Sequence, residues 1–230
     1  MSQARRTVSQ AIALESATPR QMAALAVQYP ELLREPRGNG HTVVVLPGFG
    51  ASDRSTVALR RYLGRMGYEV CGWALGTNSG NVAALTPEVI SILEQLSGQS
   101  RGSVSLVGWS MGGTISREVA RQRPDLVRRV ITMGSPITGG PKYTAFADQL
   151  AAEGVDLNEI ERHLHVRQTT GKPLRVPVTA IFSRRDGVVA WQACIDQVNL
   201  DVEHVEVRCS HIGLGFDPEV YRIIVQRLNG

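Results

Sequence analysis

Short apolar runs alternate along the chain with stretches in which apolar residues recur every three or four positions. Strands are predicted at residues 41–46, 68–73, 104–107, 127–133, 176–183 and 202–207, and the most apolar of these runs, at 41–46 and 104–107, are rich in valine. Such runs are typical of strands that are buried on both faces. The periodic stretches between them, such as residues 86–96 and 218–228, are typical of helices with one inward face. This alternation predicts an α/β fold, with a mostly parallel central sheet and helices on both of its faces.

Two segments fall outside the alternation. Residues 1–17 are expected to form a flexible tail, after which Thr18, Pro19 and Gln21 fit the capped start of a helix. Residues 137–175 contain two short helical stretches and no strand. An insertion at the carboxyl edge of a sheet suits a lid or cap over a site, and a plain structural covering is the alternative. The 230 residues therefore suit one domain with a small helical lid.

Composition narrows the function classes. The positive charges behind the net charge of +4 are scattered, and aromatic residues make up only 5% of the chain. A nucleic-acid-binding protein would need a clustered cationic face with aromatic platforms, so we expect no nucleic-acid partner. No apolar stretch reaches the length of about eighteen residues that a membrane-spanning helix needs. The first residues do not resemble a signal peptide, which predicts a cytoplasmic protein.

The cysteines and histidines do not indicate a metal site. Cys71, Cys194 and Cys209 are too few and too widely spaced for a disulfide framework or a zinc site. Three reduced thiols are expected, with a bridge between Cys194 and Cys209 as the alternative. His163 and His165 lack further ligands at a recognisable spacing. We therefore expect neither a metal nor an organic cofactor.

The strongest chemical signal lies in residues 103–117. Gly108, Ser110 and Gly112 stand at the spacing G-x-S-x-G, between a predicted strand and a predicted helix. Glycines at these positions permit a tight turn that exposes the serine hydroxyl. Glycine-rich turns of this kind also bind phosphate or simply connect elements. The strand before it and the helix after it favour Ser110 as a nucleophile, with the positive end of the helix beneath it.

A serine nucleophile needs a base, and the base needs an acid that orients it. His211 is the best placed of the five histidines, because it follows the last predicted strand in a glycine-rich loop. Asp186 lies in the turn after the strand at 176–183, where a simple Asp-Gly turn is the alternative. The order Ser110, Asp186, His211, each after a separate strand, favours a catalytic triad. Two weaker candidates for the acid are Asp196 and Asp201.

The negative charge that develops on the substrate oxygen needs two hydrogen-bond donors to stabilise it. One is expected to be the backbone amide of Met111, directly after the nucleophile. The other is expected to come from the P-G-F-G turn, through the amide of Phe49. These two amides form the predicted oxyanion hole.

Taken in order, the motifs VVVLPGFGASD, LVGWSMGG, MGSP, SRRDGVV and SHIG resemble the α/β-hydrolase superfamily. Within it they resemble bacterial esterases and lipases that have a PGFG-type oxyanion turn, and the resemblance covers most of residues 41–229. It implies the same roles as above for Ser110, Asp186, His211, Phe49 and Met111. The chain departs from the commonest pattern at Pro47, where many relatives carry histidine.

These features predict a carboxylic ester hydrolase that works through a covalent acyl-enzyme. The expected partner is a small-molecule ester with an apolar acyl group. Residues expected to make the pocket apolar, with core packing as the alternative for each, are Trp109, Ile137, Val188, Ile212 and Leu214. Other functions open to the same triad are thioester cleavage, acyl transfer and cofactor-free peroxidation. A non-catalytic ligand-binding protein on the same fold is a further alternative.

Overall fold

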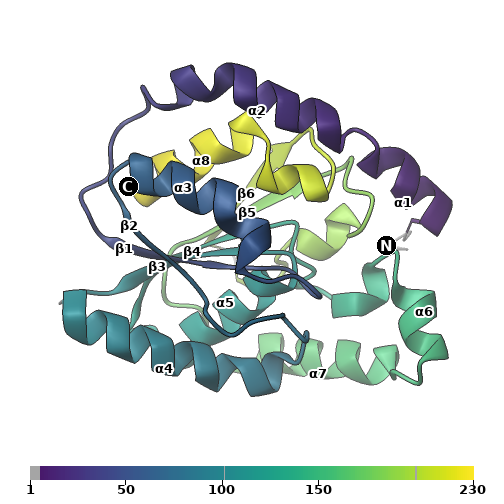
Figure 1. The fold of residues 1–230 in the computed structure, drawn as a ribbon. Helices are drawn as coiled ribbons and strands as arrows, with labels where there is room; N and C mark the ends of the chain where they lie inside the picture. The colour runs from purple at the N-terminus through teal and green to yellow at the C-terminus, as the bar shows by residue number, and fades with distance from the viewer. Residues whose placement is uncertain (1–5, 101, 200) are drawn as a thin grey trace.

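The computed structural model describes residues 6–100, 102–199 and 201–230. Within these residues, six strands form one sheet in the order β2-β1-β3-β4-β5-β6 (Figure 1). The strands are β1 (Thr42–Leu46), β2 (Glu69–Gly72), β3 (Val104–Trp109), β4 (Val127–Met133), β5 (Val178–Ser183) and β6 (Val202–Val207). Each neighbouring pair is parallel, so the prediction of a mostly parallel sheet is confirmed and the sheet is parallel throughout.

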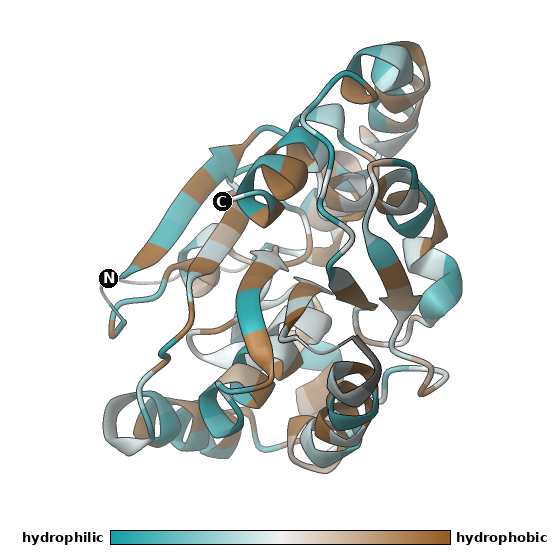
Figure 2. Cartoon of the chain, turned by 90° about the vertical axis from the view of Figure 1, so that its left-hand side faces the viewer, coloured by the Kyte–Doolittle hydropathy of each residue, from teal (hydrophilic) through white to brown (hydrophobic). Residues whose placement is uncertain are grey.

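Helices cover both faces of the sheet (Figure 1). The helices on one side are α2 (Thr18–Leu32), α3 (Val57–Arg65) and α8 (Pro218–Leu228), and those on the other side include α4 (Val82–Ser100) and α5 (Met111–Gln122). Val43 and Val45 of β1 pack towards α3 and α8, whereas Val44 and Leu46 pack towards α4 and α5. This two-sided burial explains why the inner strands β1, β3 and β5 are buried at every position. The edge strands β2 and β6 include exposed residues, and Figure 2 shows hydrophilic as well as hydrophobic residues along strands of the sheet.

The site region lies where the strand order reverses. The chain passes from β1 outward to β2 and then returns to β3 on the other side of β1. Ligand sites of open parallel sheets form at such a reversal, beyond the carboxyl ends of the strands. Leu46 pairs with Gly108, so the turns that follow β1 and β3 begin at the same level of the sheet.

The amino-terminal segment differs from its prediction. Residues expected to lie in a flexible tail form helix α1 (Val8–Glu15), so the tail prediction is wrong there, and residues 1–5 lie outside the described residues. Thr7 and Gln10 form a capping box, in which each side chain accepts the backbone N–H of the other, at 3.3 and 3.0 Å. The T-x-x-Q spacing was the local signal for this helix.

Helix α4 begins one turn earlier than the sequence suggests. It starts at Val82 rather than at Thr86, because the Asn81 side chain accepts the N–H of Ala84 at 3.1 Å and so caps the helix. Thr86 then lies inside the helix and donates its hydroxyl to the Val82 carbonyl at 2.7 Å.

The segment predicted as a lid, residues 137–175, contains helices η2 (Gly140–Tyr143), α6 (Ala147–Ala152) and α7 (Leu157–Thr170). Both predicted short helices are therefore present. Helix α7 lies beside α5, with Arg167 3.6 Å from Glu118, and its Gln168 amide donates to the Ile137 carbonyl in the loop after β4. Its role as a cap stays a prediction.

Cys71, Cys194 and Cys209 are unpaired, so no bridge joins Cys194 to Cys209. The described part of the chain contains no helix with both the length and the apolar character needed to cross a membrane.

Candidate active site

Ser110 occupies a strained turn between β3 and α5. Its φ of 52° and ψ of −121° place it in a region that residues with a side chain rarely adopt. A Cβ added to Gly108 would lie 2.4 Å from the Cα of Gly113, and one added to Gly112 would lie 2.5 Å from the Leu46 carbonyl oxygen. The turn therefore closes only because these positions lack side chains.

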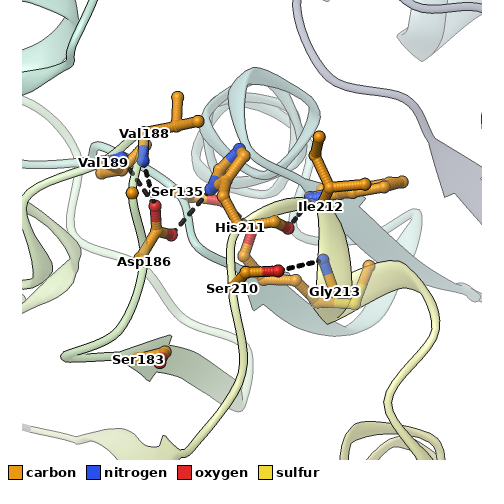
Figure 3. A network of polar contacts seen from close by, with 12 residues as sticks. Ser135, Ser183, Asp186, Val188, Val189, Ser210, His211, Ile212 and Gly213 are labelled. Carbon is orange, nitrogen blue, oxygen red and sulfur yellow. Dashed lines mark hydrogen bonds and ion pairs between the residues drawn. The ribbon is translucent and has the colours of Figure 1, made fainter. Parts of the chain in front are cut away.

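Asp186 and His211 form a buried pair (Figure 3). The Nδ1 atom of His211 lies 2.7 Å from Oδ2 of Asp186, and the two residues are only 7% and 2% exposed. The other carboxylate oxygen of Asp186 accepts the N–H groups of Val188 and Val189 at 2.8 and 2.7 Å. Asp186 is thus more than a turn former, because its carboxylate is aimed at the imidazole and held there by two amides.

The electrostatics of this pair favour a protonated imidazole. Burial acts to lower the pKa of His211, but the Asp186 carboxylate, through its charge and its hydrogen bond, acts in the opposite direction. Glu15 adds a second negative charge, and the pKa of His211 is raised above its ordinary value of 6.5. Such an environment stabilises the imidazolium that forms when a histidine takes a proton from a nucleophile.

The end of β4 joins the acid–base pair to the nucleophile turn. The Met133 carbonyl accepts the Ser110 amide at 2.7 Å, and the next residue, Gly134, donates its amide to the Ile181 carbonyl at 2.9 Å. A Cβ on Gly134 would lie 2.9 Å from Oδ2 of Asp186 and 3.0 Å from Nδ1 of His211. Gly134 has a φ of 56° and brings the backbone directly against the pair. Sequence reasoning gave it no role, although it lies in the MGSP motif.

The turn after β1 packs against the nucleophile. A Cβ on Gly48 would lie 3.3 Å from the Cβ of Ser110. Phe49, the next residue, has a side chain that is 58% exposed, and Met111 is the first residue of α5. The turn and the helix start are therefore adjacent to Ser110, and the donor roles of the Phe49 and Met111 amides stay predictions.

Asn78, which sequence reasoning missed, holds this turn. It is 1% exposed and donates its side-chain amide to the Pro47 carbonyl at 2.8 Å. Its backbone accepts the N–H of Gly50 at 2.9 Å and donates to the Ala51 carbonyl at 2.8 Å. The sequence offered only an asparagine in a polar loop, with no indication that it would bind the turn after β1.

The predicted pocket residues fall into three groups. Around His211, Trp109 donates its indole N–H to the His211 carbonyl at 3.2 Å, Leu214 is buried, and Ile212 is 44% exposed. Val188 lies beside Asp186, to which its amide donates. Ile137 lines a cavity with residues of α5 and α7 such as Thr114 and Leu164. A pocket role for these five residues stays a prediction.

The weaker acid candidates are engaged elsewhere. Asp196 pairs with the buried Arg117. Asp201 lies at the amino end of β6, whereas Ser110 lies at the carboxyl end of β3. Among the described residues, no group of three or more histidine, cysteine and acidic side chains is placed to hold a metal ion.

Comparison with known families agrees with the fold. The model of the alpha/beta hydrolase fold family matches residues 22–161, which is more than half of the chain. The chain belongs to the alpha/beta hydrolase fold family. No curated protein sequence matches it significantly.

Solved structures of other members of this fold superpose on the chain at low identity. The mature lipase BlEst2 of Bacillus licheniformis is 14% identical, with a TM-score of 0.66 over 86% of this chain and 95% of that one. A lipase-esterase related protein of Clostridium acetobutylicum is 14% identical, with a TM-score of 0.62 over 84% and 97%. A monoacylglycerol lipase of Paleococcus ferrophilus is 17% identical, with a TM-score of 0.59 over 84% and 95%. These similarities support the alpha/beta hydrolase fold.

Proposed function

We propose that the protein is a carboxylic ester hydrolase in which Ser110 is the nucleophile, His211 the base and Asp186 the acid. The observation that carries the proposal is the buried 2.7 Å contact between His211 and Asp186, fixed by Gly134 next to the strained turn of Ser110. In this proposal the imidazole of His211, polarised by Asp186, acts on the hydroxyl of Ser110, which is half-buried and lies at the reversal of the strand order. The lipase and esterase names of the structural neighbours are consistent with ester substrates.

The reaction follows from these roles. Ser110 Oγ attacks the ester carbonyl carbon while His211 takes the hydroxyl proton, and the amides of Phe49 and Met111 stabilise the oxyanion. His211 then returns the proton to the alcohol that leaves, which gives an acyl-enzyme on Ser110. Water then attacks the acyl group while His211 takes its proton, and the carboxylic acid product leaves Ser110. Asp186 keeps the proton on Nδ1 of His211 throughout, so that the other ring nitrogen is free to accept.

A panel of p-nitrophenyl esters, from acetyl to palmitoyl, tests this proposal. We expect the wild type to turn over at least one of them and Ser110→Ala to lose activity by about 10⁶-fold. The preferred chain length reports on the pocket that residues 137–175 are proposed to cover. Ser110→Ala with full activity, or a folded wild type inactive on every ester, contradicts the proposal.

A further inference from the structure

Glu15, the last residue of α1, binds both loops of the acid–base pair. Its Oε1 atom accepts the N–H of Gly187 at 3.0 Å and the N–H of His211 at 2.8 Å. Its Oε2 atom accepts the N–H of Ile212 at 2.8 Å. Hydrogen bonds to a carboxylate are about twice as strong as those between neutral groups. The Glu15 side chain thus joins Gly187, which follows Asp186, to His211.

Side chains of α2 hold the base loop at a neighbouring point. Thr18 and Ser210 share a hydrogen bond of 2.9 Å between their hydroxyls, and the Ser210 hydroxyl donates to the Gln21 side chain at 2.9 Å. Ser210 also accepts the N–H of Gly213 at 3.1 Å (Figure 3). The sequence predicted Thr18 and Gln21 as a capping box, which is wrong, because Ala17 is the N-cap and no side chain caps α2. Both side chains turn to Ser210 instead.

Two glycines let α1 and α2 approach this closely. A Cβ on Gly187 would lie 2.7 Å from the Ala11 carbonyl oxygen and 2.9 Å from Oε1 of Glu15. A Cβ on Gly213 would lie 2.0 Å from Oε1 of Gln21. The loops after β5 and β6 therefore fit the amino-terminal helices only as glycine-containing turns.

The charge of Glu15 also acts on the imidazole. The groups that set the pKa of His211 are Asp186, from the loop after β5, and Glu15, from α1, both of which raise it against the effect of burial. Trp109, which faces the ring from β3 at 6.4 Å between centroids, carries no charge. Glu15 therefore combines a geometric link with a negative charge close to the base.

We infer that Glu15 is a positioning residue of the candidate active site, which locks the loop of Asp186 to the loop of His211 and so holds the imidazole beside Ser110. The inference rests on the proposed function, because alignment of the imidazole affects turnover only if His211 is the base. A misplacement of about 1 Å at a catalytic group can lower a rate about 100-fold.

The variant Glu15→Gln tests the inference, with Glu31→Gln as its control. Glutamine has the shape of glutamate but lacks its charge, and its amino group cannot accept an N–H. We expect kcat on a p-nitrophenyl ester to fall roughly 10- to 100-fold. The acidic limb of the pH profile should move to lower pH, since the neutral imidazole is the active form and loss of a negative charge lowers its pKa. Glu31, exposed on α2, loses the same charge in Glu31→Gln, which should leave kcat and the limb unchanged.

An NMR titration of the His211 ring separates this inference from the proposed function, because it needs no substrate. A lower His211 pKa and faster amide exchange at Gly187 and Ile212 in Glu15→Gln support the inference, even if the wild type hydrolyses no ester and the proposed function fails. An unchanged pKa, exchange rate and kcat overturn it. A lower melting temperature with an unmoved pKa and kcat identifies a purely structural contact and overturns it as well.

Glu15→Asp provides the second variant. It keeps the charge but is one methylene too short to span both loops, so kcat should fall several-fold while the pKa of His211 stays raised. If Glu15→Gln does not fold, this variant decides alone. A reduced kcat at an unchanged melting temperature supports the inference, and an unreduced kcat overturns it.

Discussion

The nucleophile turn and the acid–base loops are held in place by different kinds of contact. Around Ser110 the contacts are steric, because side chains at Gly108, Gly112 and Gly113 would collide with atoms packed against the turn. Around Asp186 and His211 they are hydrogen bonds from a distant part of the chain, since Glu15 reaches partners 172 to 197 positions away.

Because of this difference, the two halves of the site should respond differently to substitutions. A steric turn is fixed by the shape of its backbone and stores strain, which packing around it must offset. A hydrogen-bonded junction depends on charge and on the docking of separate elements. Substitutions should therefore affect the stability of the fold in one half and the alignment and pKa of the base in the other.

Among the variants that keep Ser110, Asp186→Asn should lose the most activity, and it changes the hydrogen-bonded half. Asparagine can still accept the amides of Val188 and Val189, but its amino group would face Nδ1 of His211 and favour the wrong tautomer. We expect kcat on an active ester to fall by about 10⁴-fold with the fold retained. Asp201→Asn is the control and should leave kcat unchanged. Comparable losses of kcat in the two variants would contradict the acid role of Asp186.

An intermediate effect is expected from Asn78→Ala, which loosens the turn that carries Phe49. Loss of the bond to the Pro47 carbonyl leaves a buried acceptor unpaired, at a cost of about 1–3 kcal/mol of stability. We expect kcat to fall by up to about 100-fold, because the proposed oxyanion donor is displaced. Steady-state kinetics and urea unfolding measure the two effects.

Asn81→Ala is the matched control for that variant. It removes the cap of α4 at a cost of about 1 kcal/mol, because the Asn81 side chain accepts the N–H of Ala84. Its stability should fall while kcat stays at the wild-type value. If both variants lost activity in proportion to their stability, Asn78 would have no specific role at the turn.

The smallest expected effect is a gain in stability in the steric half. Ser110→Gly removes the nucleophile but relieves the strain of a φ of 52°, whereas Ser110→Ala keeps it. We expect the glycine variant to be more stable than the alanine variant by about 1 kcal/mol in urea unfolding. At Ser91, exposed in α4, the order should reverse, because glycine costs about 1 kcal/mol relative to alanine inside a helix. Equal stability of the two Ser110 variants would show that the turn stores no strain.

The six strands and the nucleophile turn could be predicted from the sequence alone. Strands buried on both faces must be apolar throughout, so Val43 to Leu46 could be recognised without knowledge of their neighbours. The glycines around Ser110 report a backbone shape that only such residues permit. The chain order of Ser110, Asp186 and His211 then predicted the pairing of acid and base, because parallel strands bring their carboxyl ends to one edge.

The contacts that hold these elements together became visible only in the folded chain. Nothing near Glu15 in the sequence identifies its three amide partners. Asn78 and Gly134 likewise act through contacts with loops that are distant in the sequence. Hydrophobic periodicity reports which face of an element is buried, but it carries no information on which polar groups meet when distant elements dock. The polar contacts of Glu15 depend on the docked position of α1 and α2, which is set by the packing of the whole chain.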